Sequence, residues 1–213
     1  MTMSIFSIDQ IAITIMGYPI SWIELLATIF GLISVYLATK ANILTWPSGI
    51  LNEFFLFLLF FQVQLYADML LQVYFFVVTL YGWYYWNVGT EERKISRITN
   101  RSRAFVISLL VLGSLGFGIF FSKIHLLLPQ FFTLAADYPY TDSFVLTASI
   151  IATFLLARKK VESWYLWILV DIVSVVLFYI KNIQFLALEY LIFLGLASFG
   201  LWNWEKQLRD ENG

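Results

Sequence analysis

Long apolar stretches separated by short polar ones follow one another along the whole chain. About 17–25 predominantly apolar residues cross a bilayer as a helix. Seven stretches meet this requirement, at roughly 19–39, 46–62, 66–87, 104–121, 141–157, 163–180 and 184–204. The stretch 122–140 is interrupted by polar residues, among them His125, and is predicted to be a loop with an interfacial apolar part. We therefore expect an all-α integral membrane protein with seven transmembrane helices.

The composition agrees with a fold whose solvent is lipid. The 213 residues are 61% hydrophobic and only 13% charged, with a mean hydropathy of +0.81. In lipid each span must satisfy its own backbone hydrogen bonds, which favours helices. The chain has no cysteine, so it has no disulfide and no thiolate metal site. We expect no cofactor and no metal, and the charges give no reason to expect nucleic acid as a partner.

The first 18 residues lack the features of a signal peptide. They have neither a basic n-region nor a small-residue cleavage site. The apolar residues in this segment favour a short amphipathic segment on the membrane surface, with simple disorder as the alternative; they are Ile5, Ile8, Ile11, Ile15 and Met16.

Residues 37–87 align without a gap on residues 155–205 when they are shifted by 118 positions. The aligned pairs include large aromatic residues, glycines and charges of the same sign: Trp46 and Trp164, Phe75 and Phe193, Gly82 and Gly200, Trp86 and Trp204, Lys40 and Arg158, Glu53 and Asp171. Three spans fit in each copy and one lies between them, which predicts a 3+1+3 parallel-repeat bundle. The expected parts are 1–18, an extracytoplasmic or interfacial segment; 19–87, the first repeat; 88–140, a linker with the fourth helix; 141–205, the second repeat; and 206–213, the tail.

The distribution of Lys and Arg predicts the orientation. With seven spans, the segments 40–45, 88–103, 158–162 and the C-terminal tail lie on one side, and they carry eleven Lys and Arg. The opposite side has only Lys123 and Lys181. Because cytoplasmic loops are enriched in Lys and Arg, we expect the N-terminus outside and the C-terminus in the cytosol.

Polar and aromatic residues form stripes at helical spacing, which predicts a site inside the bundle. The sixth span carries Trp164, Trp167, Asp171 and Ser174 on one face, and the second span carries Trp46 and Glu53 on the corresponding face. Asp171 lies seven residues past Trp164, about 10 Å along the helix axis, near the bilayer centre. Carboxylates at this depth almost always face the interior of the bundle or a water-filled path. The further candidates on the second, third and seventh spans are Asn52, Gln72, Phe75, Glu189 and Tyr190.

Simpler interpretations of these residues remain open. Tryptophans at span ends, such as Trp83, Trp202 and Trp204, are usually interfacial anchors. Asp171 and Glu53 could be protonated acids that hydrogen-bond to neighbouring helices. Gly82 and Gly200 favour close helix packing over ligand contact. No Ser–His pair, paired-aspartate motif or H-E-x-x-H motif is present in the spans, so we do not expect an enzyme.

The spans carry Lys and Arg only at their ends, which limits the substrate class. A phosphate or carboxylate would find no counter-charge at mid-membrane. Aromatic residues, carboxylates and amides suit a neutral or cationic molecule with a flat ring and hydroxyl groups, because a ring cation gains from contact with Trp and with a carboxylate.

Two long stretches resemble the PnuC-type nicotinamide riboside transporter family of bacteria. They are QVQLYADMLLQVYFFVVTLYGWYYW at 62–86 and KKVESWYLWILVDIVSVVLFYIKNIQFLALEYLIF at 159–193. The W-x-x-W-x-x-x-D pattern at Trp164, Trp167 and Asp171 is similar to a family motif that ends in Asn or Asp. The likeness extends from Ser21 to the tail and is weakest around the fourth span.

The resemblance implies a seven-helix fold similar to full-length SWEET-type sugar transporters, in a bacterial inner membrane. It implies facilitated diffusion of nicotinamide riboside, which a cytosolic riboside kinase then phosphorylates and traps. Trp164, Trp167 and Asp171, with Gln72 and Glu189, are then expected to form the substrate cage, with Tyr190 and Asn52 as second choices. The alternatives are another flat-ring vitamin, of the thiamine or riboflavin type, and a SWEET-like sugar facilitator or structural bundle. The apolar outer faces also leave a homo-oligomer open, with a trimer as one arrangement.

Overall fold

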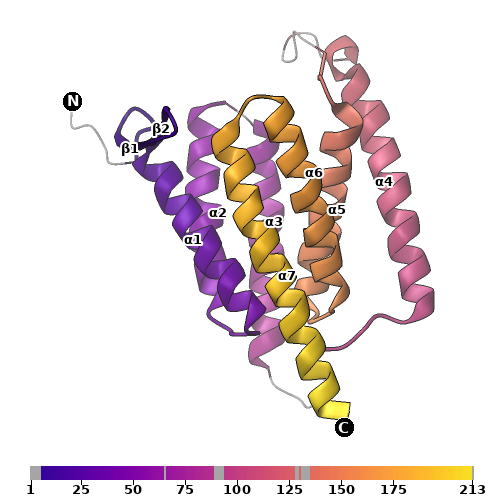
Figure 1. Ribbon diagram of the computed structural model, residues 1–213. Coiled ribbons are helices and arrows are strands. Elements are labelled where there is room, and N and C mark those ends of the chain that lie inside the picture. Colours follow the sequence, from indigo (N-terminus) through magenta and orange to yellow (C-terminus); the bar gives the residue numbers. More distant parts are fainter. Residues whose placement is uncertain (1–5, 65, 89–93, 128–129, 131–134, 213) are drawn as a thin grey trace.

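Seven α-helices make up most of the described part of the chain (Figure 1). The computed structural model describes residues 6–64, 66–88, 94–127, 130 and 135–212. The helices are α1 (Trp22–Thr39), α2 (Thr45–Gln62), α3 (Tyr66–Asn87), α4 (Asn100–Leu127), α5 (Pro139–Ala157), α6 (Glu162–Ile180) and α7 (Gln184–Asn212). Five of them, α1, α4, α5, α6 and α7, are long and apolar enough to cross a membrane. The all-helical prediction is therefore confirmed, and its ranges agree well for all but the ends of α4 and α7.

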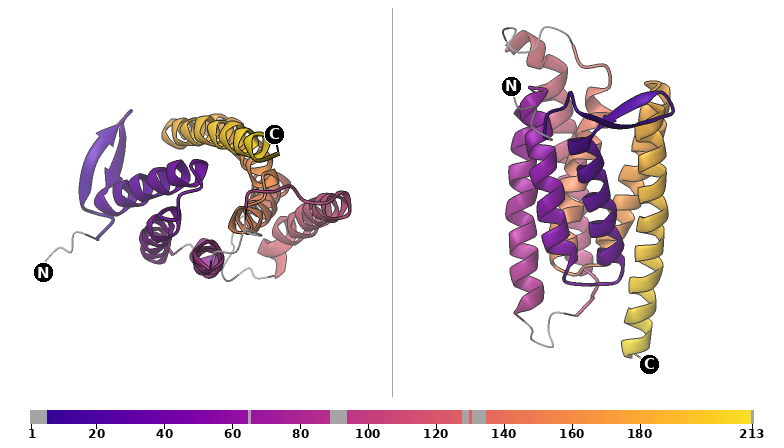
Figure 2. Two further views of the ribbon diagram at one scale, coloured as in Figure 1. Left: turned by 90° about the horizontal axis from the view of Figure 1, so that it is seen from below. Right: turned by 90° about the vertical axis from the view of Figure 1, so that its left-hand side faces the viewer.

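Six helices form a closed ring, and α4 lies outside it (Figure 2). Neighbours in the ring follow the order α1, α2, α3, α5, α6, α7, and α7 returns to α1. Helix α4 packs along α5. In this order α3 and α7 lie on opposite sides of the ring, so a contact between them crosses its interior.

The turns inside each half of the chain have matching backbone geometry. Outside the N-terminal hairpin, the described non-glycine residues with positive φ are Ala41, Gln64, Lys159 and Asn182, which form two pairs 118 positions apart. After α1 the amide of Asn42 donates to the carbonyl of Leu37 at 3.0 Å, and after α5 the amide of Lys160 donates to the carbonyl of Leu155 at 2.9 Å. This six-to-one bond around a left-handed residue is the Schellman pattern that ends helices. The same offset therefore relates the backbone as well as the sequence.

The N-terminal residues form a β-hairpin, which the sequence interpretation did not include. Strands β1 (Ile11–Ile15) and β2 (Tyr18–Ser21) are antiparallel, and Met16 and Gly17 between them both have positive φ, as a two-residue hairpin turn requires. Ser21 ends β2 and caps α1 in a capping box with Glu24. The hairpin is thus fixed directly to the first helix.

The hairpin also contacts the same end of α7 and α2. The Tyr18 ring stacks on Phe185 of α7 with centroids 5.4 Å apart, and its hydroxyl donates to Glu24 at 3.0 Å. Burial, followed by the nearby Glu24 carboxylate, raises the pKa of the Tyr18 phenol. The amide of Ile8 donates to Gln62 at the end of α2 at 3.1 Å. The N-terminal segment therefore covers the ends of three helices of the ring.

Helix α4 is longer than predicted, so His125 lies in its last turn and not in a loop. The prediction ended the span at the first polar residues, Ser122 and Lys123, but such residues are tolerated in a helix near its end. Ser122 donates to the carbonyl of Ile119 within the helix at 2.9 Å.

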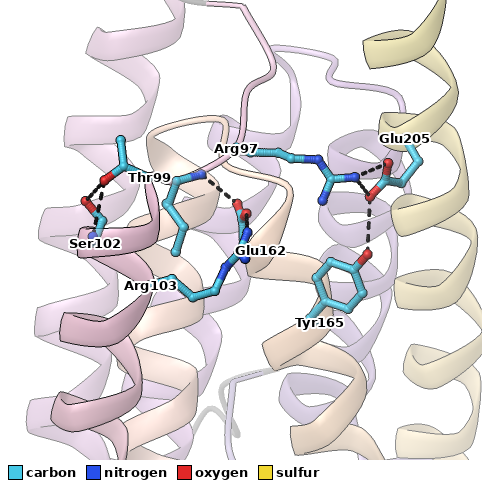
Figure 3. A network of polar contacts seen from close by, with 8 residues as sticks. Arg97, Thr99, Ser102, Arg103, Glu162, Tyr165 and Glu205 are labelled. Carbon is cyan, nitrogen blue, oxygen red and sulfur yellow. Dashed lines mark hydrogen bonds and ion pairs between the residues drawn. The ribbon is translucent and has the colours of Figure 1, made fainter.

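The segment before α4 is held to α6 and α7 by polar contacts (Figure 3). Nη2 of Arg97 donates to both carboxylate oxygens of Glu205 in α7, each at 2.6 Å. The hydroxyl of Tyr165 in α6 donates to the same carboxylate at 3.2 Å. Glu162 accepts from the amide of Ile98 at 3.1 Å. These contacts lie at the end of the ring opposite the hairpin.

Candidate functional site

The candidate residues come from four helices of the ring and lie on their inward or half-buried faces. Helix α2 contributes Trp46, Asn52 and Glu53; α3 contributes Gln72 and Phe75; α6 contributes Trp164, Trp167, Asp171 and Ser174; and α7 contributes Glu189 and Tyr190. The buried members are Trp46, Glu53, Gln72, Trp164, Asp171 and Ser174, and the others are half-buried. The helical spacing therefore predicted which side of each helix faces the interior, but not how far along the bundle axis each residue lies.

Asp171 is the central carboxylate of the group. Its side chain is only 3% exposed, and among the described residues it has no hydrogen-bond partner. Ser174, one turn further along α6, is also buried. The phenol of Tyr190 on α7 lies close to Ser174 and interacts electrostatically with Asp171 and with Asp68 of α3. The carboxylate of Asp171 and the hydroxyls of Ser174 and Tyr190 thus lie in one region between α6 and α7.

Aromatic rings flank this region. Tyr190 stacks on Phe178 with centroids 5.4 Å apart and meets Phe193 edge-on at 6.3 Å. Phe193 also approaches Gly31 of α1. Phe75, which aligns with Phe193 in the repeat, is half-buried on α3. Flat rings beside carboxylates are suitable for a flat cationic ligand.

Trp164 and Trp46 lie at one end of the bundle, where each packs against a glycine and a second tryptophan. A Cβ on Gly200 would come within 2.7 Å of the Trp164 ring, and a Cβ on Gly82 within 2.3 Å of the Trp46 ring. Each tryptophan therefore packs directly against a glycine of the same half. Both indole Nε1 atoms are buried and have no partner among the described residues. Trp167 is half-buried and packs against the hydrophobic clusters on both sides of α6.

Glu53, the counterpart of Asp171, is engaged with a neighbouring helix. Its Oε1 accepts a hydrogen bond from Thr79 of α3, and its Oε2 has no partner among the described residues. The second half has alanine, Ala197, at the position that aligns with Thr79. The difference leaves Asp171 without the hydroxyl partner that Glu53 has.

Glu189 faces α1 near the hairpin end. Its carboxylate interacts with Thr28 and, through charge, with Glu24. Glu24 in turn accepts from Tyr18 of the hairpin. Glu189 therefore lies further toward that end than Asp171, beside a network that the sequence interpretation did not detect.

Asn52 holds two helices together. Its Nδ2 donates to the carbonyl of Ala27 in α1 at 2.8 Å, and Gly31 leaves the space for it. The amide is thus already used within the protein, which argues against Asn52 as a ligand for the substrate.

We expect Asn52→Ala to lower the free energy of unfolding by about 1 kcal/mol, with substrate affinity in the folded protein unchanged, because the change removes one helix–helix hydrogen bond. Thermal unfolding of the purified protein and ligand titration check the two effects separately. Asn87→Ala, at an exposed position at the end of α3, is the control. A tenfold loss of affinity without loss of stability would restore Asn52 to the binding site.

Two residues outside the predicted set belong to the same region. Asp68, near the start of α3, is exposed, and its charge acts on the phenol of Tyr190 in α7. Thr79 completes the contact with Glu53. Helical spacing was the available signal for both, because Asp68, Gln72 and Thr79 share one face of α3.

The electrostatics of the interior are acidic or neutral. Among the described residues, the buried polar side chains are serines, threonines, Gln72, Glu53 and Asp171, with no Lys or Arg. Lys159, in the turn before α6, is a half-buried cation, and burial lowers the pKa of its ammonium group. No group of His, Asp and Glu suited to a metal ion occurs in the described ranges.

Comparison with known proteins identifies the family. The family model described as "Nicotinamide mononucleotide transporter" matches residues 21–206. The chain is 31% identical to the nicotinamide riboside transporter PnuC of Escherichia coli strain K12, over 98% of this chain and 97% of the relative. It is 29% identical to the riboflavin/roseoflavin transporter RibM of Streptomyces davaonensis, over 94% of this chain and 92% of the relative.

The fold agrees with a solved structure of the same group. A crystal structure of the vitamin B3 transporter PnuC matches with a TM-score of 0.67 and 23% sequence identity, over 89% of this chain and 83% of that chain. The predicted resemblance is therefore confirmed by sequence and by fold. The chain belongs to the nicotinamide mononucleotide transporter family, and it is a multi-pass membrane transporter of the PnuC type rather than an enzyme.

Proposed function

We propose that this protein carries nicotinamide riboside across a bacterial inner membrane by facilitated diffusion. Phosphorylation by a cytosolic riboside kinase then traps the product and drives net uptake. The observation that carries the proposal is the identity to the E. coli nicotinamide riboside transporter over nearly the full length of both chains. The acidic, aromatic interior supports it, because the substrate is a flat cation that carries ribose hydroxyls.

The proposed binding region lies between the two halves of the ring. In this proposal Asp171 balances the charge of the pyridinium ring, and the rings of Tyr190, Phe178 and Phe193 lie beside it; the stacking of Tyr190 on Phe178 and its edge contact with Phe193 support this. Ser174, Gln72 and Asp68 supply groups that pair with ribose hydroxyls or the carboxamide. Trp167 borders the region from the half-buried face of α6. The absence of buried Lys and Arg among the described residues disfavours the phosphorylated mononucleotide, as trapping requires.

The proposed architecture is two three-helix units in the same orientation, related to the SWEET arrangement, with α4 connecting them in sequence and packing outside the ring. The matched left-handed turn residues and the order of helices in the ring support it. An odd number of spans per unit requires one extra helix to keep the units parallel, and α4 supplies it. The excess of Lys and Arg at the end opposite the hairpin supports a cytosolic location of that end, with the N-terminus outside.

Ligand titration and uptake test the proposed function. We expect purified protein to bind nicotinamide riboside in the micromolar range and to bind its mononucleotide much more weakly. Proteoliposomes should take up labelled riboside without dependence on a pH gradient, and Asp171→Asn should keep this activity. Absence of riboside binding would overturn the proposal, and uptake driven by a pH gradient would replace diffusion with proton coupling.

A second candidate substrate is a flavin. It is favoured by the 29% identity to the riboflavin/roseoflavin transporter over 94% of this chain. Riboflavin also has a flat ring and hydroxyl groups, but it is neutral and larger. Tight binding of riboflavin with no binding of nicotinamide riboside would assign the chain to this alternative, and thiamine belongs in the same titration series.

We also propose that the protein forms a homo-oligomer, with a trimer as one candidate arrangement. The outer faces of the ring helices and of α4 are apolar, as Leu112 and Phe117 on α4 illustrate. Light scattering of the detergent-purified protein measures the number of chains directly.

A further inference from the structure

Four tryptophans form an unbroken chain of ring contacts across one end of the bundle. The centroids of Trp46 and Trp86 lie 5.0 Å apart, those of Trp86 and Trp204 lie 6.2 Å apart, and those of Trp204 and Trp164 lie 5.5 Å apart. Each half of the chain contributes two of the rings. The middle contact joins α3 to α7, which lie on opposite sides of the ring of helices. This contact therefore crosses the interior of the bundle.

The two central indoles also fasten the halves to each other. Trp86 Nε1 donates to the carbonyl of Ala157 at the end of α5, and Trp204 Nε1 donates to the carbonyl of Ala38 at the end of α1, both at 3.1 Å. Carbonyls in the last turn of a helix lack partners within the helix. The carbonyl of Ala38 also accepts from the amide of Ala41 in the following turn at 2.9 Å, so the Trp204 indole is a second donor to that oxygen. Each bond runs from the last helix of one half to the first helix of the other. The two bonds lie at the two seams where the halves meet.

The four tryptophans pack into one hydrophobic cluster with residues from other segments. All four side chains are buried, and Ala197, Ile95 and Val161 pack into the same cluster. Ile95 comes from the segment before α4, whose next residue, Ser96, is hydrogen-bonded to the turn before α6. The ammonium group of Lys159 lies 4.9 Å from the centroid of the Trp86 ring.

We propose that Trp86 and Trp204 are the cytosolic gate of the transport path. The gate opens when the two rings separate and the indole N–H groups leave the carbonyls of Ala157 and Ala38. The proposal rests on the proposed function in two respects, because it assumes that the substrate moves between the two halves and that this end of the bundle faces the cytosol. A ring pair with one bond at each seam makes opening depend on the movement of one half against the other.

A single introduced thiol can report on this gate, because the chain has no cysteine of its own. Ala197 is buried on α7, seven residues before Trp204 and about 10 Å deeper along the helix. Its substitution Ala197→Cys adds one small atom behind the tryptophan layer. A membrane-impermeant maleimide is then applied to oriented vesicles from the cytosolic side or from the outer side.

We expect slow labelling from the cytosolic side when all four tryptophans are present. Trp86→Phe or Trp204→Phe removes the N–H donor and part of the ring, and should raise the cytosolic rate about tenfold, with a larger increase for the double variant. Labelling from the outer side should stay unchanged. The controls are Trp83→Phe and Trp202→Phe, on the same two helices but 39% and 55% exposed, and they should leave both rates unchanged.

Three outcomes would overturn the gate. They are an unchanged cytosolic rate in both gate variants, an equal increase from the two sides, and an equal increase in the control variants. The two gate positions are equivalent in the repeat, so either variant that elutes as the parent protein on size exclusion suffices. Labelling needs no substrate, so it remains informative if the titration with nicotinamide riboside fails. That failure would reject the proposed substrate and leave the gate intact.

Discussion

Asp171→Ala is expected to weaken the binding of nicotinamide riboside by about 10- to 100-fold. A contact to a charged group contributes about 1.5–3 kcal/mol, and each 1.4 kcal/mol corresponds to a factor of ten in affinity. Asp171 is 3% exposed and forms no ion pair with a described residue, so its carboxylate is not neutralised by a cation of the protein. Calorimetric titration of the purified protein measures the change.

Two further substitutions separate charge from shape. Asp171→Asn keeps the size and the hydrogen-bonding atoms, so its affinity should lie between those of the parent and of the alanine variant. Asp142→Asn, at an exposed carboxylate 4.0 Å from Lys181, should leave affinity unchanged. Riboside affinity within twofold of the parent in a folded Asp171→Ala protein would remove this carboxylate from the site.

Gly82→Ala should destabilise the protein by about 1–3 kcal/mol, the usual cost of overpacking a core. The added Cβ would lie 2.3 Å from the rigid ring of Trp46, which is buried and cannot move away without disturbing Trp86. Gly200→Ala meets the Trp164 ring at 2.7 Å and should have a similar effect. Thermal unfolding followed by tryptophan fluorescence should give a lower midpoint for both variants.

Gly195→Ala is the matched control on α7. A Cβ there meets nothing within 4 Å, so the higher helix propensity of alanine should leave the midpoint unchanged or raise it. If Gly82→Ala and Gly200→Ala were as stable as Gly195→Ala, the close packing of tryptophan on glycine would not contribute to the stability of the bundle.

The spans were predictable from the sequence because each apolar stretch ends at a short polar turn. The turns after α1 and α5 contain Lys40 and Arg158, and they end the helices within a residue or two of the prediction. The N-terminal hairpin was not predictable in the same way. Ile11, Ile13 and Ile15 do alternate as in a strand, and Gly17 follows them as a turn residue. The interpretation as an amphipathic segment instead followed the spacing of Ile8, Ile11 and Ile15, and a five-residue strand is too short for its period to decide between the two.

The candidate site was predicted by face but not by depth. Trp164 and Asp171 share a stripe on α6, as expected, yet only Asp171 lies beside Tyr190 and Ser174. Trp164 is committed to Gly200 and Trp204 at the end of the helix. A stripe gives direction around the helix axis, whereas the partners on the opposite helix decide what a residue does, and these are known only once the helices are assembled.

Helix α4 has a mechanical consequence because of where it packs. It lies along α5, and its Arg103 reaches Glu162 of α6 at 3.6 Å, so its described contacts are with the second half of the chain. If the two halves rock against each other, α4 would therefore move together with α5. One moving unit then has three helices, α1 to α3, and the other has four, α4 to α7. Movement of the four-helix unit also displaces the lipid around α4. The resistance of the bilayer to such a movement would fall mostly on α4, which lies outside the ring of helices.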